Sequence, residues 1–415
     1  MERHHRPDGL TRPQREAMLR SLTNGRGALS RRSMLRTAGG LALGTAGAGA
    51  LAGCGAPVEG QSARSDGEDH SGEEKAVKFS NWLGYIDVGE DRKSHPTLDT
   101  FRRRTGIKVT YTEDINSNLE FYEKIKPRLT AGRDTGRDLI CLTDWMAARF
   151  VRNGWVQKLN VSNLPNAYAN LSAQFRGLDW DPARVYSYAW TGIFAVIAYN
   201  DKATDGRKVD SMEQLLEDSR LKGRIGLLTE MRDTVGMTLL DMSLRPEQFT
   251  TDDYDSAIAR LQRAVDRGQV RRFTGNDYID DLKKGRIAAC LAWAGDLVQL
   301  QADHPEIKFA IPDAGYMTST DNLLIPNKAR HKENAERLID YFYEPKVAAR
   351  LAAWINYVCP VDGVREELEQ IDPDLADNPL ILPDEEMTEK SHTFRSLSQD
   401  EETEYEKKFS RLIGA

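Results

Sequence analysis

From residue 76 onward, hydrophobic and polar positions repeat along the chain with two different periods. The stretch 107–111 alternates apolar and polar residues, as a half-buried strand does, and 139–142 is a short apolar run typical of a buried strand. The stretch 118–130 repeats its apolar residues every three or four positions, which predicts one buried face of a helix. The same reasoning predicts strands at 76–82, 107–111, 139–142, 192–199, 224–228, 287–293, 308–311 and 322–325, and helices at 97–104, 118–130, 147–153, 211–217, 234–244, 251–267, 294–301, 332–343 and 345–355.

Strands and helices alternate along the chain from residue 76 onward, which we call the body of the protein. The alternation predicts an α/β fold in which a parallel or mixed sheet is covered by helices on both faces. The chain of 415 residues is too long for one compact sheet of usual size, so two lobes are expected. Ligands of open α/β sheets bind beyond the carboxyl ends of strands, and clefts between domains are favoured sites. Residues that directly follow strands are therefore the first candidates for function.

Residues 1–53 have the pattern of an export signal. Arg31 and Arg32 open a basic segment, an uncharged stretch rich in Ala, Gly and Leu follows, and small residues precede Cys54. The paired arginines resemble those of twin-arginine signals. The tetrad Leu-Ala-Gly-Cys that ends at Cys54 resembles a lipobox, whose cysteine is acylated and becomes the mature N-terminus. The sequence therefore predicts an exported lipoprotein that is anchored to the outer face of the cytoplasmic membrane.

A transmembrane anchor is the rival interpretation of this segment. The apolar stretch is short for a spanning helix and rich in glycine, which is costly in a helix interior. We therefore favour the lipid anchor. Residues 54–75 hold almost no large apolar side chains and are expected to form a flexible tether between the anchor and the folded body.

Charge favours a cationic partner for the body. The whole chain has a net charge of −7, and residues 1–53 carry nine Arg and three acids, a net of +6, so subtraction leaves −13 for the remainder. An acidic body disfavours nucleic acid as a partner and favours cations, although such acidity also serves solubility alone.

The cysteines and histidines argue against metal and nucleophile chemistry. No CxxC pair occurs, and no histidine lies near a cysteine at the spacing of a zinc site. Cys141 and Cys290 stand in apolar runs, where a cysteine is by default a small buried side chain. A disulfide between two of Cys141, Cys290 and Cys359 stays open. No GxSxG, HExxH or glycine-rich phosphate loop is present, so we expect neither a cofactor nor an enzyme.

Several predicted strands end in the same kind of sequence, an aromatic residue beside a small polar or acidic one. Aromatic faces attract cations, and carboxylates hold ammonium groups by charge-assisted hydrogen bonds. A linear aliphatic chain with amines needs both, because each buried ammonium must be paired to offset its desolvation. The candidate ligand-binding residues are Trp82, Tyr85, Thr143, Trp145, Glu230, Asp233, Trp293, Asp296 and Asp321.

Each of these residues also has a structural interpretation. A single Trp at a strand end is commonly core packing. Asp233 and Asp296 precede or open helices and are candidate N-caps, and the hydroxyl of Thr143 is a candidate turn former. The recurrence of the pattern at successive strand ends favours the binding interpretation over these alternatives.

Four segments resemble one family, the spermidine/putrescine-binding proteins of bacterial ABC importers. Phe79-Ser-Asn-Trp-Leu-Gly-Tyr85 is similar to the family's opening strand and turn, and Thr105-Gly-Ile-Lys-Val-Thr-Tyr111 to its second strand. Tyr188-Ala-Trp-Thr-Gly192 resembles the first crossover between lobes, and Leu291-Ala-Trp-Ala-Gly-Asp296 resembles the putrescine-type members. The resemblance runs from about residue 78 to about residue 357.

The resemblance implies a two-lobed fold of the periplasmic-binding-protein type (type II), with hinge crossovers and a mixed sheet flanked by helices in each lobe. It implies capture of putrescine or spermidine between the lobes, delivery to ABC permease subunits and a monomeric protein. The family's aromatic walls fall on Trp82, Tyr85, Trp145 and Trp293, its polar contact on Thr143, and its amine-binding carboxylates on Glu230, Asp233 and Asp296. The expected division places residues 76–190 and 296–343 in lobe 1, and 191–295 and 344–415 in lobe 2.

Three positions depart from the family pattern. Gly84 stands where members often carry an acid, Arg350 where Gln is frequent, and Thr320 where an aromatic residue is expected. These departures concern the identity of the ligand more than the fold, and a sugar or another organic cation remains the alternative ligand. An enzyme that uses Glu230 and Asp233 as acid and base, as in glycoside cleavage, is the third alternative.

Overall fold

The structure is a computed structural model that describes residues 67–414. The described chain divides into two units, residues 88–96 and the remainder. The short unit contains a loop in which the amide of Gly89 donates to the carbonyl of Ser94 over 2.9 Å.

The larger unit is built on one sheet with the strand order β2-β1-β3-β9-β4-β7-β5-β6, to which β10 adds beside β9 and β8 beside β4. Its strands are β1 (Ala76–Trp82), β2 (Lys108–Ile115), β3 (Leu139–Thr143), β4 (Ser187–Asn200), β5 (Ile225–Leu228), β6 (Val270–Thr274), β7 (Ala289–Trp293), β8 (Ile307–Ala310), β9 (Tyr316–Leu324) and β10 (Ser391–Thr393).

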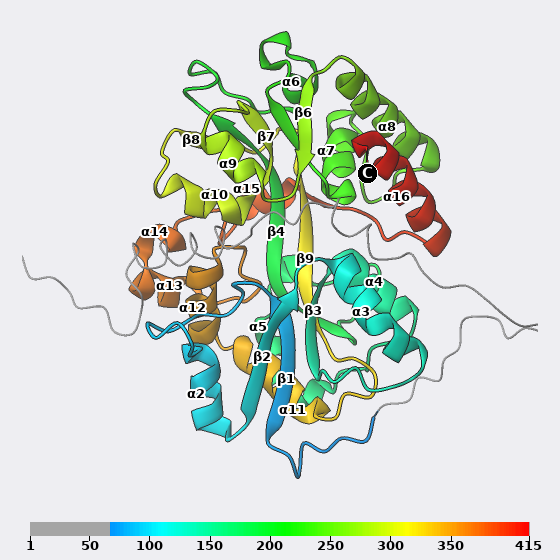
Figure 1. The fold of residues 1–415 in the computed structure, drawn as a ribbon. Coiled ribbons are helices and arrows are strands. Elements are labelled where there is room, and N and C mark those ends of the chain that lie inside the picture. The colour runs from blue at the N-terminus through cyan, green and yellow to red at the C-terminus, as the bar shows by residue number, and fades with distance from the viewer. Residues whose placement is uncertain (1–66, 415) are drawn as a thin grey trace, which may run out of the picture. The chain divides into compact units, whose positions relative to one another are not determined.

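Strands β4 and β9 join two groups of strands. They are antiparallel neighbours over most of their lengths and run side by side through the middle of the unit (Figure 1). The carboxyl half of β9 pairs with β3, next to β1 and β2, whereas β4 pairs further along with β7 and β8. β4 is buried at nearly every position, which explains its long apolar sequence.

Gly192 lies where β4 passes from one group to the other. Its backbone bridges to Val358, and a Cβ at this position would come within 2.7 Å of the Phe175 ring. The close packing of two backbone segments here therefore requires glycine.

The helices are α2 (Pro96–Thr105), α3 (Asn118–Thr130), α4 (Asp144–Arg152), α5 (Pro165–Asn170), α6 (Met212–Glu217), α7 (Met231–Asp241), α8 (Thr251–Asp266), α9 (Tyr278–Lys283), α10 (Ala294–Gln301), α11 (Lys332–Phe342), α12 (Pro345–Ile355), α13 (Arg365–Ile371), α14 (Pro373–Ala376), α15 (Glu385–Glu389) and α16 (Gln399–Ile413). α16 lies beside α8 (Figure 1), where the rings of Tyr254 and Tyr405 stack 4.0 Å apart. The remaining regular elements of the described residues are three short 3₁₀ turns, η2 (Val161–Asn163), η3 (Ala173–Phe175) and η4 (Ser219–Leu221).

Residues 69–74, which the sequence assigns to the tether, bond to the start of α11. The hydroxyl of Ser71 accepts from the amide of Asn334 over 3.1 Å, and Glu74 lies 2.8 Å from the imidazole of His331. The signal residues Arg31 and Arg32, the lipidation candidate Cys54 and the rest of the tether lie outside the described residues.

Three further findings concern the part of the chain that the structure describes. No helix in it is long and apolar enough to cross a membrane. It contains no group of three or more His, Cys, Asp or Glu residues arranged to hold a metal ion. Cys141, Cys290 and Cys359 are buried free thiols, so no disulfide links them, and burial raises the pKa of Cys359 to about 12.

Candidate functional site

Asp321 forms one end of the candidate site. Strand pairing sets it opposite Thr143, and the Thr143 hydroxyl donates to its carboxylate over 2.7 Å. The Tyr85 hydroxyl donates to the other oxygen over 2.8 Å. The side chain is buried, and burial raises the pKa of the Asp321 carboxyl to about 6 against the opposing effect of these two hydrogen bonds.

Asp296 lies in the first turn of α10, directly after β7. Tyr278 donates its hydroxyl to the carboxylate over 2.5 Å, and Asn276 donates its amide over 2.8 Å. The Tyr357 hydroxyl approaches the second oxygen at 3.5 Å, a marginal hydrogen bond. Burial raises the pKa of Asp296, while the three donors lower it.

Tyr357 connects these two acids. Its ring centroid lies 6.4 Å from that of Tyr85, which bonds Asp321, while its hydroxyl reaches Asp296. The Tyr357 ring also packs closely against the α10 backbone at Gly295, where a Cβ atom would lie only 2.7 Å from the ring. Glycine at this position therefore allows the close approach of the ring.

Asp233 is the third buried acid. It lies in the first turn of α7, and the indole N–H of Trp293 donates to it over 2.8 Å. Burial first, and then the negative charge of Glu230, raise the pKa of Asp233 to about 7, against the opposing effect of Arg232. The Trp293 ring packs edge to face against Tyr278 with centroids 6.3 Å apart. Asp233 and Asp296 are thus joined through aromatic residues, as Asp296 and Asp321 are.

The N-cap interpretation is wrong for Asp233 and Asp296, since both lie inside their helices. The N-cap of α7 is Glu230, whose carboxylate accepts from the amide of Arg232 over 3.4 Å. The same carboxylate lies 3.6 Å from the Arg232 guanidinium. That guanidinium also covers the Trp145 ring at 4.4 Å from its centroid. The structure thus gives both Glu230 and Trp145 a cationic neighbour from the protein itself.

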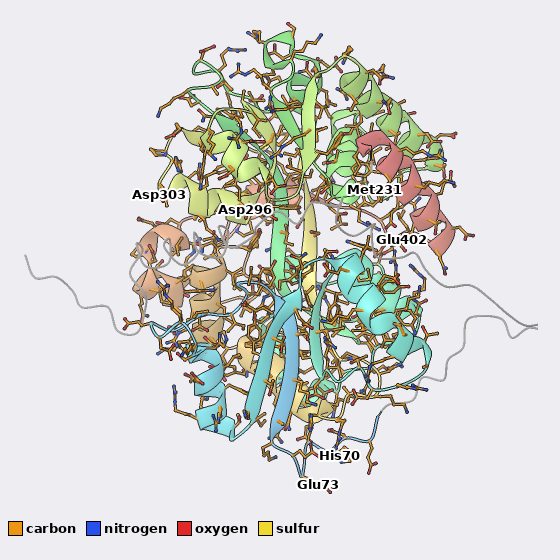
Figure 2. All side chains as sticks on the ribbon, viewed as in Figure 1. His70, Glu73, Met231, Asp296, Asp303 and Glu402 are labelled. Atoms are coloured by element: carbon orange, nitrogen blue, oxygen red, sulfur yellow. The ribbon has the colours of Figure 1, made fainter. Side chains whose placement is uncertain are left out.

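Three candidates lie outside the series of contacts that links the others: Trp145 and Glu230, which contact Arg232, and Trp82. Trp82 packs against both hydrophobic clusters of the core, and its carbonyl accepts from Tyr111 over 3.4 Å. The indole N–H groups of Trp82 and Trp145 are buried and have no hydrogen-bond partner among residues 67–414. The connected set is therefore Thr143, Asp321, Tyr85, Tyr357, Asp296, Tyr278, Trp293 and Asp233. Figure 2 labels Asp296, which lies in the first turn of α10.

Comparison with known proteins shows the family to which this chain belongs. The model of the bacterial extracellular solute-binding proteins matches residues 97–383 of this chain. The chain belongs to this family. Among curated relatives, the spermidine/putrescine-binding periplasmic protein of Escherichia coli is 27% identical over 76% of this chain and 86% of its own length. The putrescine-binding periplasmic protein PotF of the same organism is 28% identical over 78% of this chain and 87% of its own.

Solved structures of such solute-binding proteins show the same fold. A spermidine/putrescine ABC transporter substrate-binding protein from Streptococcus pneumoniae superposes with a TM-score of 0.69 at 19% identity, over 81% of this chain and 98% of that one. A lipoprotein of Treponema pallidum gives 0.68 at 18% identity, over 82% and 100%. The expected two-lobed α/β fold is therefore confirmed, with β4 and β9 as the long strands between the two strand groups.

Sequence reasoning missed several residues of the candidate site and its surroundings. Tyr278 and Asn276 precede or open the short helix α9, and Tyr357 follows α12, so none of the three follows a predicted strand. Asp144 was passed over although it directly follows β3. Its oxygens accept from the Asn322 side chain at 2.7 Å and from the Thr320 amide at 2.6 Å, and burial raises its pKa to about 6.

The structure shows the surroundings of the three positions that depart from the family pattern. Gly84 has a positive φ of 79°, which favours glycine, and its carbonyl accepts from the indole of Trp354 over 3.0 Å. Arg350 lies on α12, and burial raises the pKa of the nearby Tyr341 to about 12 against the opposing positive charges of Arg104 and Arg350. Thr320 donates its amide to Asp144.

Proposed function

We propose that this protein captures a linear polyamine, putrescine or spermidine, between its lobes. The observation that carries the proposal is the series of buried carboxylates at Asp321, Asp296 and Asp233, joined by aromatic side chains. The partners of Asp296 and Asp321 are neutral hydroxyl and amide groups, with no positive charge among the causes of their pKa shifts. A buried carboxylate without a cation is costly, and a ligand ammonium would remove that cost.

The aromatic residues between these acids suit the methylene segments of such a ligand. Tyr85, Tyr357, Tyr278 and Trp293 supply rings between successive carboxylates, and ring faces attract ammonium groups as well as alkyl chains. The names of the curated relatives also support a polyamine, since they include spermidine/putrescine-binding and putrescine-binding proteins. Of the remaining candidates, we extend the proposed ligand contacts to Trp82 and Thr143, whereas Trp145 and Glu230 border the site and both contact Arg232.

Isothermal titration of residues 67–415 with putrescine and spermidine tests the proposal. We expect binding by the natural sequence and a loss of roughly 10- to 100-fold in affinity for Asp296→Asn, because a hydrogen bond to a charged group contributes about 1.5–3 kcal/mol. Asp280→Asn is the matched control, since its carboxylate is exposed and pairs with Lys284. Absence of both heat and thermal stabilisation with every polyamine would reject polyamine capture.

One observation favours a second candidate, an organic cation that also carries a hydrogen-bond acceptor. The buried indole N–H groups of Trp82 and Trp145 have no partner within residues 67–414. Because an unpaired buried donor is costly, a ligand acceptor would stabilise each of them. Titration with a cationic amino acid, whose carboxylate supplies an acceptor, beside the polyamines, separates the two candidates.

We infer that binding closes the two lobes about the hinge strands and that the loaded protein then docks on ABC permease subunits. This role requires no chemistry on the ligand, so we propose that the protein is not an enzyme. Recovery of unmodified ligand after prolonged incubation, checked by mass spectrometry, is the expected result. The lobe boundaries 76–190 with 296–343 and 191–295 with 344–415, and the monomeric state, are part of the same proposal.

We further propose that the protein is exported through a twin-arginine signal and anchored by lipid at Cys54. The motif around Arg31 and Arg32 and the tetrad ending at Cys54 support this proposal. In the native host, Cys54→Ala is expected to release the protein from the membrane fraction. Retention of this variant on membranes would contradict the lipid anchor.

A further inference from the structure

A cluster of charged side chains links α4, α7 and the C-terminal helix α16. Glu402 of α16 accepts hydrogen bonds from Arg149 over 3.2 Å, from Arg152 over 3.1 Å and from Arg232 over 3.0 Å. Only 6% of the Glu402 side chain is exposed. Figure 2 shows Glu402 near Met231, the first residue of α7. Glu406 adds a second carboxylate, 3.7 Å from Arg149 and 3.8 Å from Arg232.

Arg232 extends from this cluster into the candidate site. Its guanidinium lies 4.4 Å from the centre of the Trp145 ring and 3.6 Å from the Glu230 carboxylate. An aromatic face beside a carboxylate is the environment that an ammonium group prefers. This place is therefore occupied by a cation that belongs to the protein.

A ligand cannot displace Arg232 without cost. The guanidinium is 12% exposed and bonded to the buried Glu402, and separating such a pair leaves an uncompensated buried charge. An incoming ammonium beside Glu230 would also face the positive charge of Arg232 at close range. Beyond Asp233, the site is thus closed to a further cation.

We propose that Arg232 is a specificity-determining residue that limits the ligand to at most three ammonium groups. The three acids left for a ligand are Asp321, Asp296 and Asp233, whereas Arg232 fills the fourth place, between Trp145 and Glu230. A tetra-amine such as spermine then carries one ammonium group more than the three acids can pair. This inference rests on the proposed function, the capture of a polyamine.

Titration of the natural sequence and of Arg232→Ala with spermidine and spermine tests the inference. The natural protein is expected to bind spermine at least about tenfold more weakly than spermidine. Arg232→Ala removes the cation that lies between Trp145 and Glu230. We expect the ratio of spermidine affinity to spermine affinity to fall by about tenfold or more in this variant. Arg232→Lys keeps a cation at this position and is expected to retain the preference for spermidine. If Arg232→Ala fails to fold, Arg232→Gln replaces it, because the amide still donates to Glu402.

Arg152→Ala is the matched control. It removes one arginine from the same carboxylate, Glu402, but leaves Trp145 covered by Arg232 and Arg149. The inference is overturned if the ratio of spermidine affinity to spermine affinity is the same in the natural protein and in Arg232→Ala, or if Arg152→Ala changes this ratio as much as Arg232→Ala does. In both cases, binding of spermidine still upholds the proposed function. Failure of the natural protein to bind any polyamine would reject both.

Discussion

Asp321 is an acid whose partners are both neutral hydroxyl groups. Thr143 and Tyr85 donate to its two oxygens, and the side chain is 1% exposed. In the unliganded protein its ionised form is therefore costly, which is why its pKa rises to about 6. A residue in this state is unfavourable for the fold alone and favourable for binding a cation.

The substitution Asp321→Asn should therefore change stability and affinity in opposite directions. We expect the unliganded variant to unfold at the same temperature as the natural protein or a higher one, because an amide avoids the desolvation of a carboxylate. Its affinity for a polyamine should fall roughly 10- to 100-fold, because a charged hydrogen-bond partner is lost. Calorimetric unfolding without ligand and isothermal titration provide the two measurements. A clear loss of stability without loss of affinity would show that Asp321 serves the fold.

At this scale, residues that follow a buried strand could be found from the sequence. Thr143 and Trp293 end strands that are recognisable as short apolar runs, and Asp296 follows within the next helical turn. Tyr278 and Tyr357 could not be found, because they come from a six-residue helix and from a segment after α12. Only the tertiary packing brings their hydroxyls to Asp296.

At the scale of elements, the sequence predicts the long periodic segments well, whereas pairing with neighbouring strands determines the extent of the other elements. α3, α10 and α12 match their expected ranges. β9 is longer than expected, since its polar first half is held by pairing with β4 and β10. The edge strand β6 has two exposed arginines and carries a weak apolar signal, so pairing with β5 determines it. α16 is amphipathic, but no prediction was made for it.

The described N-terminal segment is attached to α11 by His331. Its imidazole lies 2.9 Å from Asp138 and 2.8 Å from Glu74, and the ring is buried. Burial lowers the pKa of His331, but the hydrogen bonds and charges of the two carboxylates outweigh it, so the net pKa is raised. The pKa of Glu74 is lowered, chiefly by the hydrogen bond to His331. The attachment is strongest where His331 is protonated and Glu74 is ionised.

The substitution His331→Gln should therefore destabilise the protein in a pH-dependent way. A raised histidine pKa stabilises the fold below the ordinary value of about 6.5, and this stabilisation is lost as pH rises through the folded-state pKa. We expect the difference in unfolding temperature between the natural protein and His331→Gln to be largest near pH 5–6 and to shrink toward about pH 8–9. Thermal unfolding of both proteins across this range is the measurement. A difference that grows with pH would contradict the protonated pair, and His304→Gln, on a partly exposed histidine, is the control.

At the scale of the whole molecule, the buried acids couple ligand binding to protons. The pKa of Asp233 is raised to about 7, and those of Asp144 and Asp321 are each raised to about 6. Because these folded-state values exceed those of the unfolded chain, the acids stabilise the unliganded fold at low pH, and this contribution is lost as pH rises through about 6 to 7. Under the proposed function a polyamine pairs with the ionised forms of Asp233 and Asp321, so binding is expected to release the protons that these two acids hold.

Affinity should thus fall as the solution becomes acidic, while the unliganded protein becomes more stable. Between about pH 8 and about pH 5.5 we expect affinity for spermidine to drop by at least tenfold, with net proton release on binding near neutral pH. Titration calorimetry in two buffers of different ionisation enthalpy measures the released protons directly. Amine groups of the ligand stay protonated throughout this range, so the change reports on the protein. Equal affinities at both pH values, with no proton release, would contradict the raised pKa values of Asp233 and Asp321 and with them this prediction.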